Sequence, residues 1–345
     1  MKPVALRMLA VTLALACLAG CVPRRRGEPA IPQPEMEMPA PALPTPSPTP
    51  APTAALPARS TEQRLYGSAG LLAWPCVLYS LYLDEPEGGA VWSEEDIARS
   101  QQNLALAVDW ITDQAAEYGV TPTLYAGEED LVIRMRYAGT FAGGQSADES
   151  ETFYRAAEAL CEELDTETLT KTYGTSNIGF LLFLPVAGCS FTMVHYLEDG
   201  DAYYHEYSCL YRENAFFPEG TFETPAVYAH EILHLFGAPD LYDRSNDLFV
   251  TPALVDYVET SWPDAIMQDT YNADGSLDYE AVDKIICPLT AYRLGLCATF
   301  AGIEQFPAAA ADPPGTFRLD PQTDPALYRR DDLIAAAPPR APRHG

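Results

Sequence analysis

Two histidines and a glutamate lie close together in the segment 229–240, which reads Ala-His-Glu-Ile-Leu-His-Leu-Phe-Gly-Ala-Pro-Asp. On a helix, His230 and His234 fall on one face, one turn apart, because residues four apart are neighbours there. That spacing lets both rings bind one Zn²⁺ ion at about 2.0–2.1 Å. Glu231 lies beside the pair, where a carboxylate can take a proton from a water that the metal activates. The segment therefore predicts a catalytic metal site.

Asp240 is the predicted third ligand. Gly237 can take the left-handed conformation that ends a helix, and Pro239 blocks any helical continuation. The chain then turns back, which would bring the Asp240 carboxylate to the metal and leave a fourth position for water, as in catalytic zinc sites. Two alternatives stay open. Glu259 could serve as third ligand from a second helix, or the zinc could be structural, although such sites often use Cys and no Cys lies near this segment.

The pattern H-E-x-x-H-x-x-G-x-x-D at 230–240 resembles the metzincin signature with Asp in place of the last His. The longer string 230–243 is similar to the immune inhibitor A type of secreted bacterial metalloprotease, and snapalysin-like proteases share the aspartate variant. The resemblance covers about residues 221–269. It implies a zinc metalloprotease with a methionine turn below the metal. Met267, in Asp-Ala-Ile-Met at 264–267, is the counterpart, although one Met after a Pro-containing loop is also typical of an ordinary core.

The predicted reaction is the hydrolysis of peptide bonds. Zn²⁺ lowers the pKa of its water toward ~7, and Glu231 takes the proton and passes it to the leaving amine. The hydroxyl of Tyr271 or Tyr242 is a candidate hydrogen-bond donor to the oxyanion. The chain has 20 tyrosines, so the alternative is that either one lies near the site by chance. The alternative is a catalytically weak or inactive surface lipoprotein of zincin fold that acts as a binding module. Glu231 argues against that alternative, since a pure metal binder needs no general base.

The N-terminus has the pattern of a lipoprotein signal peptide over residues 1–20. Lys2 and Arg7 precede an apolar run at 8–18 that is too short to span a membrane. Leu-Ala-Gly-Cys at 18–21 resembles a bacterial lipobox, which implies cleavage before Cys21 and its acylation with fatty acids such as palmitate. An ordinary secretory signal with an incidental Cys is the alternative. Residues 21–60 form the predicted linker, with eleven prolines between positions 29 and 57 that favour extended polyproline II.

Composition sets the limits of the remaining chain. Residues 61–303 have a globular composition and form the predicted metalloprotease domain, and 304–345 form a predicted disordered tail rich in Ala and Pro. The net charge of −28 argues against nucleic acid as a partner. The expected protein is a monomer that acts on a protein or peptide at the bacterial cell surface or the extracytoplasmic face of a membrane, held by its N-terminal lipid. Asn-Ala-Asp-Gly-Ser at 272–276 suggests either a weak Ca²⁺ loop or an ordinary Asx turn.

Six cysteines remain once Cys17 leaves with the signal and Cys21 carries lipid. An even number in an exported domain predicts disulfides. A hairpin of residues 190–196 and 202–210, symmetric about position 199, places Cys189 opposite Cys209 and makes them the predicted pair. Buried thiols are the alternative. Cys76 could also ligate the zinc as a latency switch.

The expected fold class is α+β. The predicted order is strand 77–83, helix 94–118, strand 129–137, helix 149–164, strand 178–185, the hairpin, helix 225–236 and a C-terminal helix 278–294. This order resembles the upper half of a metzincin-like zincin, a twisted mixed sheet backed by helices with an active-site helix and a mostly helical C-terminal subdomain. In that family an edge strand above the metal pairs with the extended substrate. Here the edge is expected within residues 190–196.

Overall fold

The computed structural model describes residues 65–85, 89–137, 156–197, 204–242, 245, 247–272 and 274–318. The signal peptide, Cys21 and the linker lie outside these residues, so they stay predictions. In the part of the chain that is described, no helix has the length and apolar character needed to cross a membrane.

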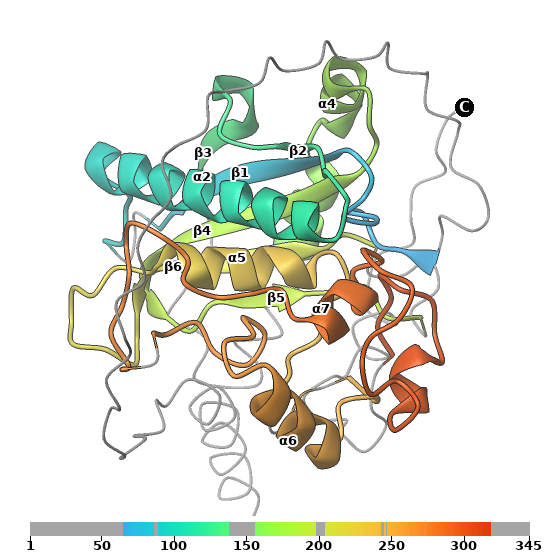
Figure 1. Ribbon diagram of the computed structural model, residues 1–345. Helices are drawn as coiled ribbons and strands as arrows, with labels where there is room; N and C mark the ends of the chain where they lie inside the picture. Colours follow the sequence, from blue (N-terminus) through green and yellow to red (C-terminus); the bar gives the residue numbers. More distant parts are fainter. Residues whose placement is uncertain are drawn as a thin grey trace, which may run out of the picture.

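A six-stranded, mostly parallel sheet forms the centre of the molecule (Figure 1). Its strands are β1 (Cys76–Asp84), β2 (Leu124–Tyr125), β3 (Val132–Arg136), β4 (Ile178–Gly188), β5 (Phe191–Met193) and β6 (Tyr207–Asn214). They follow the order β2-β1-β4-β6-β5, and β3 also pairs with β1. Only the pairing of β5 with β6 is antiparallel among the named strands. β5 therefore forms one edge of the sheet, within the segment where the edge was predicted.

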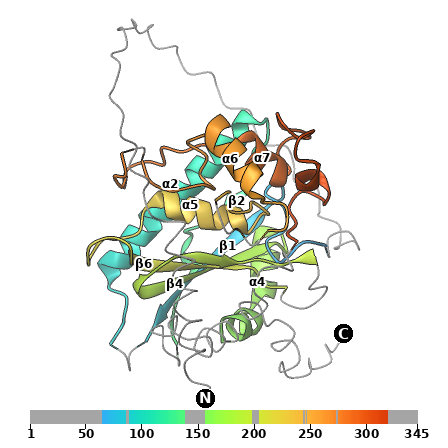
Figure 2. The same cartoon turned by 90° about the horizontal axis from the view of Figure 1, so that it is seen from below.

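Helices cover both faces of the sheet (Figure 2). Helices α2 (Glu94–Glu117) and α5 (Pro225–His234) lie on one face, and α4 (Thr166–Tyr173) lies on the other. Strand β4 contributes side chains to the hydrophobic clusters on both faces of the sheet, because successive side chains of a strand point in opposite directions. Leu181 and Phe183 pack in the cluster with α2 and α5, whereas Phe180 and Leu182 pack in the second cluster. Burial on both sides is typical of parallel strands, and the architecture is a mixed α/β sheet between helices.

Helix α2 confirms the helix that was predicted for residues 94–118. Ser93 caps its N-terminus, since the Ser93 hydroxyl accepts a hydrogen bond from the backbone N–H of Asp96 at 3.0 Å. The chain leaves the helix through Gly119, whose φ is +78°. One buried polar contact fixes α2 against the segment before α5, because Asn103 donates to the backbone carbonyl of Glu223 at 2.8 Å.

The C-terminal part of the chain differs from the prediction. The predicted helix 278–294 is wrong over most of its length, because α7 spans only Pro288–Arg293. Pro288 lacks an N–H and starts the helix at its first position, and Ile285 pairs with Ala265 as an isolated bridge instead. A helix that was not predicted, α6 (Pro252–Ser261), and a short 3-10 helix, η4 (Pro307–Ala310), complete this part. Among its described residues it consists of short helices joined by turns and irregular segments, not of one dominant helix.

The folded part of the chain continues beyond the predicted boundary at residue 303. Phe317 pairs with Tyr196, and its carbonyl accepts a hydrogen bond from Leu197 at 2.9 Å. The buried guanidinium of Arg293 donates to the backbone carbonyl of Thr316. The described residues of the predicted tail, 304–318, are therefore packed onto the domain.

The predicted pairing of Cys189 with Cys209 is wrong. Strand β4 runs on to Gly188, so Cys189 lies in the turn before β5 and not in the hairpin. The register places Phe191 opposite Cys209, two residues away from the predicted position. Both cysteines carry thiols in the structure.

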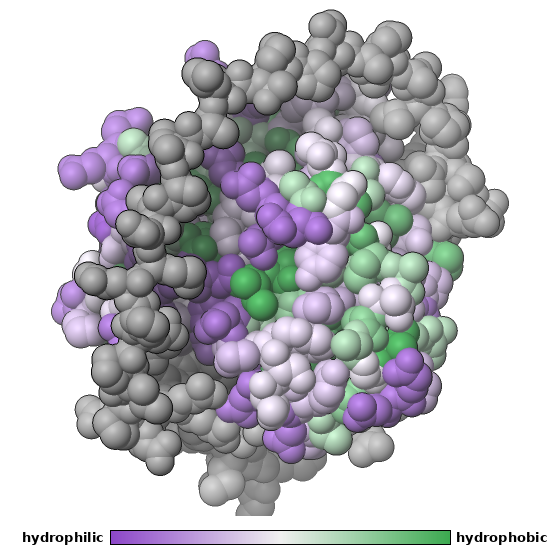
Figure 3. Space-filling model, viewed as in Figure 1, coloured by the Kyte–Doolittle hydropathy of each residue, from purple (hydrophilic) through white to green (hydrophobic). Residues whose placement is uncertain are grey.

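The surface seen in Figure 3 mixes hydrophilic and hydrophobic side chains, with no single continuous apolar face over the described residues in that view. Few large apolar side chains are exposed in the described part of the chain, and they are scattered in sequence: Leu65, Val91, Leu248 and Ile285. Scattered apolar residues of this kind are normal for a folded domain.

Candidate metal centre

Helix α5 carries the two histidines and is buried along its whole length. Thr224 caps it, accepting a hydrogen bond from the N–H of Val227 at 3.4 Å, and Pro225 occupies the first position, where a missing N–H costs nothing. The structure thus confirms a helix here, with bounds Pro225–His234. A helix that is apolar all round belongs in a core, so the three polar residues His230, Glu231 and His234 stand out within it.

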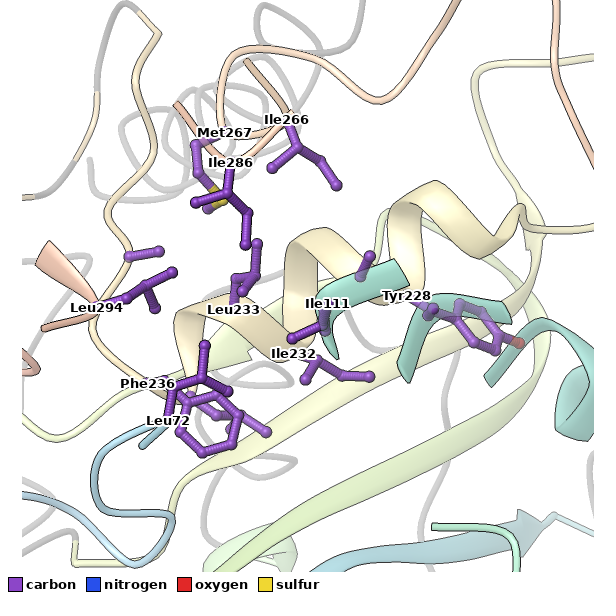
Figure 4. Packing of buried hydrophobic residues seen from close by; sticks show 14 of the residues in the cluster. Leu72, Ile111, Tyr228, Ile232, Leu233, Phe236, Ile266, Met267, Ile286 and Leu294 are labelled. Atoms are coloured by element: carbon purple, nitrogen blue, oxygen red, sulfur yellow. The ribbon is translucent and has the colours of Figure 1, made fainter. Parts of the chain in front are cut away.

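The apolar residues of α5 fix the orientation of the helix (Figure 4). Ile232 lies toward Ile111 of α2, and Leu233 points toward Met267 and Ile286. All of these side chains are almost completely buried. Because both sides of the helix are packed in this way, its rotation is fixed, and the two histidines are presented together to the turn that follows.

That turn brings Asp240 to the histidines. Gly237 has a φ of +97°, a conformation that glycine adopts without strain. The turn also needs glycine for space, since a Cβ on Gly237 would lie 2.4 Å from the Cα of Gly315. The N–H of Leu241 then donates to the carbonyl of Met267 at 2.8 Å, which anchors the far end of the turn.

Three ligand atoms converge at this point. The Nε2 atoms of His230 and His234 are 3.1 Å apart, and they lie 3.1 Å and 3.2 Å from Oδ1 of Asp240. Four ligands at about 2.0–2.1 Å in a tetrahedron lie ~3.3–3.4 Å from one another. The triangle is close to one face of such a tetrahedron. His230, His234 and Asp240 can therefore hold a metal ion together.

The other ring nitrogens show which tautomers are present. Nδ1 of His230 lies 3.0 Å from the carbonyl of Ile266, and Nδ1 of His234 lies 2.6 Å from the carbonyl of Ala238. A carbonyl only accepts, so each Nδ1 carries the hydrogen and each neutral ring presents a lone pair at Nε2. Two lone pairs and a carboxylate then face one another, and only a positive charge among them resolves the repulsion. Backbone partners of this kind also orient histidine ligands in metal sites.

The pKa values of His230 and Asp240 also favour a positive charge between these side chains. Burial alone would lower the pKa of His230, but its hydrogen bond to Asp240 and the charges of Glu231 and Asp240 raise that pKa to about 9. Burial alone would raise the pKa of Asp240, yet the two imidazoles hold it far below its usual range. Without a metal, a proton therefore occupies the place that a cation would take.

Glu231 lies next to this triangle and is held by strand β5. Its Oε2 accepts a hydrogen bond from the Thr192 hydroxyl at 2.8 Å. Only 5 % of Glu231 is exposed, and burial raises the pKa of its carboxyl, although His230 and His234 partly oppose this. A buried carboxyl with a raised pKa can exchange protons nearer neutral pH than an exposed one.

The remaining predicted residues have mixed outcomes. Met267 is fully buried beside α5, and its neighbour Ile266 supplies the carbonyl that binds His230. Tyr271 is buried with its ring against Phe217 at 5.4 Å, and Tyr242 is half-buried two residues after Asp240. The role of either tyrosine as an oxyanion donor stays a prediction.

The alternative ligands do not join the triangle. In the described part of the chain, neither Glu259 nor Cys76 belongs to a metal-capable group. Cys76 lies at the start of β1 and is completely buried in the core. Within the segment predicted as a Ca²⁺ loop or an Asx turn, the Asp274 carboxylate accepts a hydrogen bond from the N–H of Ser276 at 2.9 Å, which is the contact of an Asx turn.

A second group that could hold a metal was not predicted from the sequence. Glu158, Glu162 and His205 have ligand atoms within 4.8 Å of one another, on the face of the sheet away from α5. His205 Nδ1 is already bonded to Glu158 at 2.8 Å. The four-residue spacing of the two glutamates was a visible signal, but the contribution of His205 depends on tertiary structure.

Comparisons with known proteins add no relative. No protein-family model matches the chain, and neither the curated proteins nor the solved structures gave a match. The inference of function therefore depends on the geometry of His230, His234, Asp240 and Glu231.

Proposed function

We propose that the chain is a zinc-dependent endopeptidase of metzincin-like fold, held at the outer face of a bacterial membrane by a lipid. The observation that carries this proposal is the triangle of two imidazole lone pairs and a carboxylate, with the buried carboxylate of Glu231 beside it. The side chain of Asp240 keeps 24 % of its surface exposed, so the group is not sealed from solvent. Three protein ligands and an open position are the pattern of catalytic zinc, whereas structural zinc has four protein ligands.

Each residue has a role that follows from its position. His230, His234 and Asp240 would hold the ion, and the carbonyls of Ile266 and Ala238 keep the rings in the required tautomer. Zinc, when bound, supplies a Lewis acid that polarises a carbonyl and makes water more acidic. Glu231 takes the proton from the attacking water and delivers it to the leaving amine. Its burial favours this exchange because the raised pKa lets the carboxyl both accept and release the proton.

Strand β5 supports a peptide as the substrate. It is the outermost strand on its side of the sheet, and its central residue, Thr192, contacts Glu231. An extended peptide that adds to such an edge gains main-chain hydrogen bonds and lies beside the general base. The net charge of −28 argues against nucleic acid as the substrate.

The anchor is a separate part of the proposal. Cys21 follows the short apolar segment, and the proline-rich linker up to residue 60 would separate the domain from the lipid. Cys21→Ser should abolish labelling by a fatty-acid analogue and release the protein from membranes. Membrane association that is unchanged in this variant would show that another element anchors the protein.

A binding module is the second candidate function, and one observation favours it. The third ligand is an anionic Asp and not a third His, which makes the bound metal a weaker Lewis acid. The deciding experiment measures hydrolysis of casein and a peptide library by the protein from residue 61 onward, with and without a chelator. Cleavage that the chelator abolishes and zinc restores supports the peptidase. No cleavage by zinc-loaded protein would favour the binding module.

A further inference from the structure

We infer that Thr192, on the edge strand, is a positioning residue that aims the Glu231 carboxylate, an inference that rests on the proposed peptidase function. The Thr192 hydroxyl lies 2.8 Å from Oε2 of Glu231 and 2.9 Å from the backbone carbonyl of the same residue. Ser208 lies directly opposite Thr192 in the pairing of β5 with β6. The Ser208 hydroxyl is 3.1 Å from the Glu231 carbonyl and 2.9 Å from the Thr192 hydroxyl.

The hydrogens can be assigned from chemistry. Each hydroxyl has one hydrogen to donate. A hydrogen bond to an ionised carboxylate is about twice as strong as one to a neutral acceptor, so the Thr192 hydrogen goes to Oε2 of Glu231. Ser208 then donates to the Glu231 backbone carbonyl. In this arrangement Thr192 fixes the side chain and Ser208 fixes the backbone.

The contact matters because a glutamate side chain has several rotatable bonds and the reaction needs one orientation. Oε2 is held by Thr192, which leaves Oε1 to receive the proton of the attacking water. The same threonine sits in the strand where the substrate would pair, so one residue sets the distance between the substrate backbone and the general base. A misplacement of about 1 Å in such a group can cost on the order of 10²-fold in rate.

The experiment compares Thr192→Val with Thr192→Ser and Ser208→Ala. Valine replaces the hydroxyl with a methyl group of similar size, and serine keeps the hydroxyl. We expect kcat on a cleaved peptide to fall ~10- to 100-fold in T192V, with KM within about 2-fold and zinc content unchanged. T192S should recover most of kcat, and S208A should lose less than T192V. T192A removes the same hydroxyl and is the second variant if T192V folds poorly.

Two further measurements separate positioning from a structural role. Crystal structures should show the Glu231 carboxylate displaced in T192V and retained in T192S. In the background of Glu231→Gln, Thr192→Val should cause almost no further loss of kcat, because the carboxylate that it positions is gone. A T192V protein with kcat within about 2-fold of the parent, or with Glu231 unmoved, would overturn the inference. A parent that cleaves no peptide would overturn the proposed function as well, whereas an active parent with an equally active T192V would overturn only the positioning role.

Discussion

Two groups of side chains in the described part of this molecule are close enough to hold a metal, and they differ in what surrounds them. In the first, backbone carbonyls bind Nδ1 of both histidines, so that His230 and His234 direct lone pairs at Asp240. In the second, the Nδ1 atom of His205 is already paired with the carboxylate of Glu158, and Glu162 is exposed. Proximity is common to both groups. Only in the first group do backbone carbonyls orient the histidine rings so that their Nε2 lone pairs and the Asp240 carboxylate face one another. We therefore expect only this group to retain a metal through purification.

The largest expected effect comes from removing a ligand of the buried group. Purified protein should contain about one zinc per chain, and His230→Ala or His234→Ala should reduce this to background and abolish peptidase activity. Elemental analysis of the folded variants measures the loss. Full zinc content in both variants would show that the metal is bound elsewhere and would reverse the comparison of the two groups.

The next effect separates metal binding from hydrolysis. Glu231→Gln keeps the size of the side chain and removes the basic carboxylate, so hydrolysis should fall by ~10²- to 10⁴-fold. Zinc content should stay at the level of the parent, because Glu231 is not one of the three converging ligands. Zinc content and initial rates are measured on the same preparation. Equal rates for the variant and the parent would contradict the proposed role of Glu231.

Removal of the metal should destabilise the protein in a pH-dependent way. A ligand present at about 1,000 times its Kd stabilises the folded state by about 4 kcal/mol, which chelation removes. In the metal-free protein the raised pKa of His230, about 9, adds stability that is fully present below the ordinary histidine pKa and is lost as the pH rises through 9. Thermal melts of metal-free and zinc-loaded protein at pH 7 and pH 9.5 should therefore show a wider gap at the higher pH. A gap that narrows would contradict the raised pKa of His230 in the metal-free protein.

The smallest effect is expected at the second group. His205→Ala removes a partly exposed pair with Glu158, and such pairs contribute about 1 kcal/mol or less. Zinc content and peptidase rate should match the parent, which makes this variant the matched control for His230→Ala. A loss of one equivalent of metal in His205→Ala would show that the second group is also a site, and the contrast drawn above would be wrong.

The part of the site that could be predicted from the sequence is the part that depends on local geometry. His230, His234 and Asp240 lie within eleven residues, on one helix and one turn, so periodicity and the turn residues were sufficient. Thr192 lies 39 positions from Glu231 in the chain. Its contact with Glu231 depends on the pairing register of β5 and β6, and the predicted register differs from the observed one by two residues.

The errors in the fold have a similar cause. The helix predicted for 278–294 was wrong because it placed Pro288 in the interior of a helix. Proline starts a helix and rarely continues one, and α7 begins at Pro288. Helix α6 was missed although Thr251-Pro252 repeats the start signal of Thr224-Pro225 at α5. Strands β1 and β4 and helices α2 and α5 were predictable because each of those elements has a strong pattern of its own, whereas the short strand β2 and helix α4 were not predicted. The packing of Phe317 beside Tyr196 has no local signal and could not be foreseen.

The most direct test of the central claim is a crystal structure with diffraction data collected on both sides of the zinc absorption edge. We expect one strong anomalous peak at about 2.0–2.1 Å from Nε2 of His230, Nε2 of His234 and a carboxylate oxygen of Asp240. The fourth position around it should hold solvent. A peak beside His205, a fourth protein ligand at the buried group, or no zinc peak in zinc-loaded crystals would contradict the account.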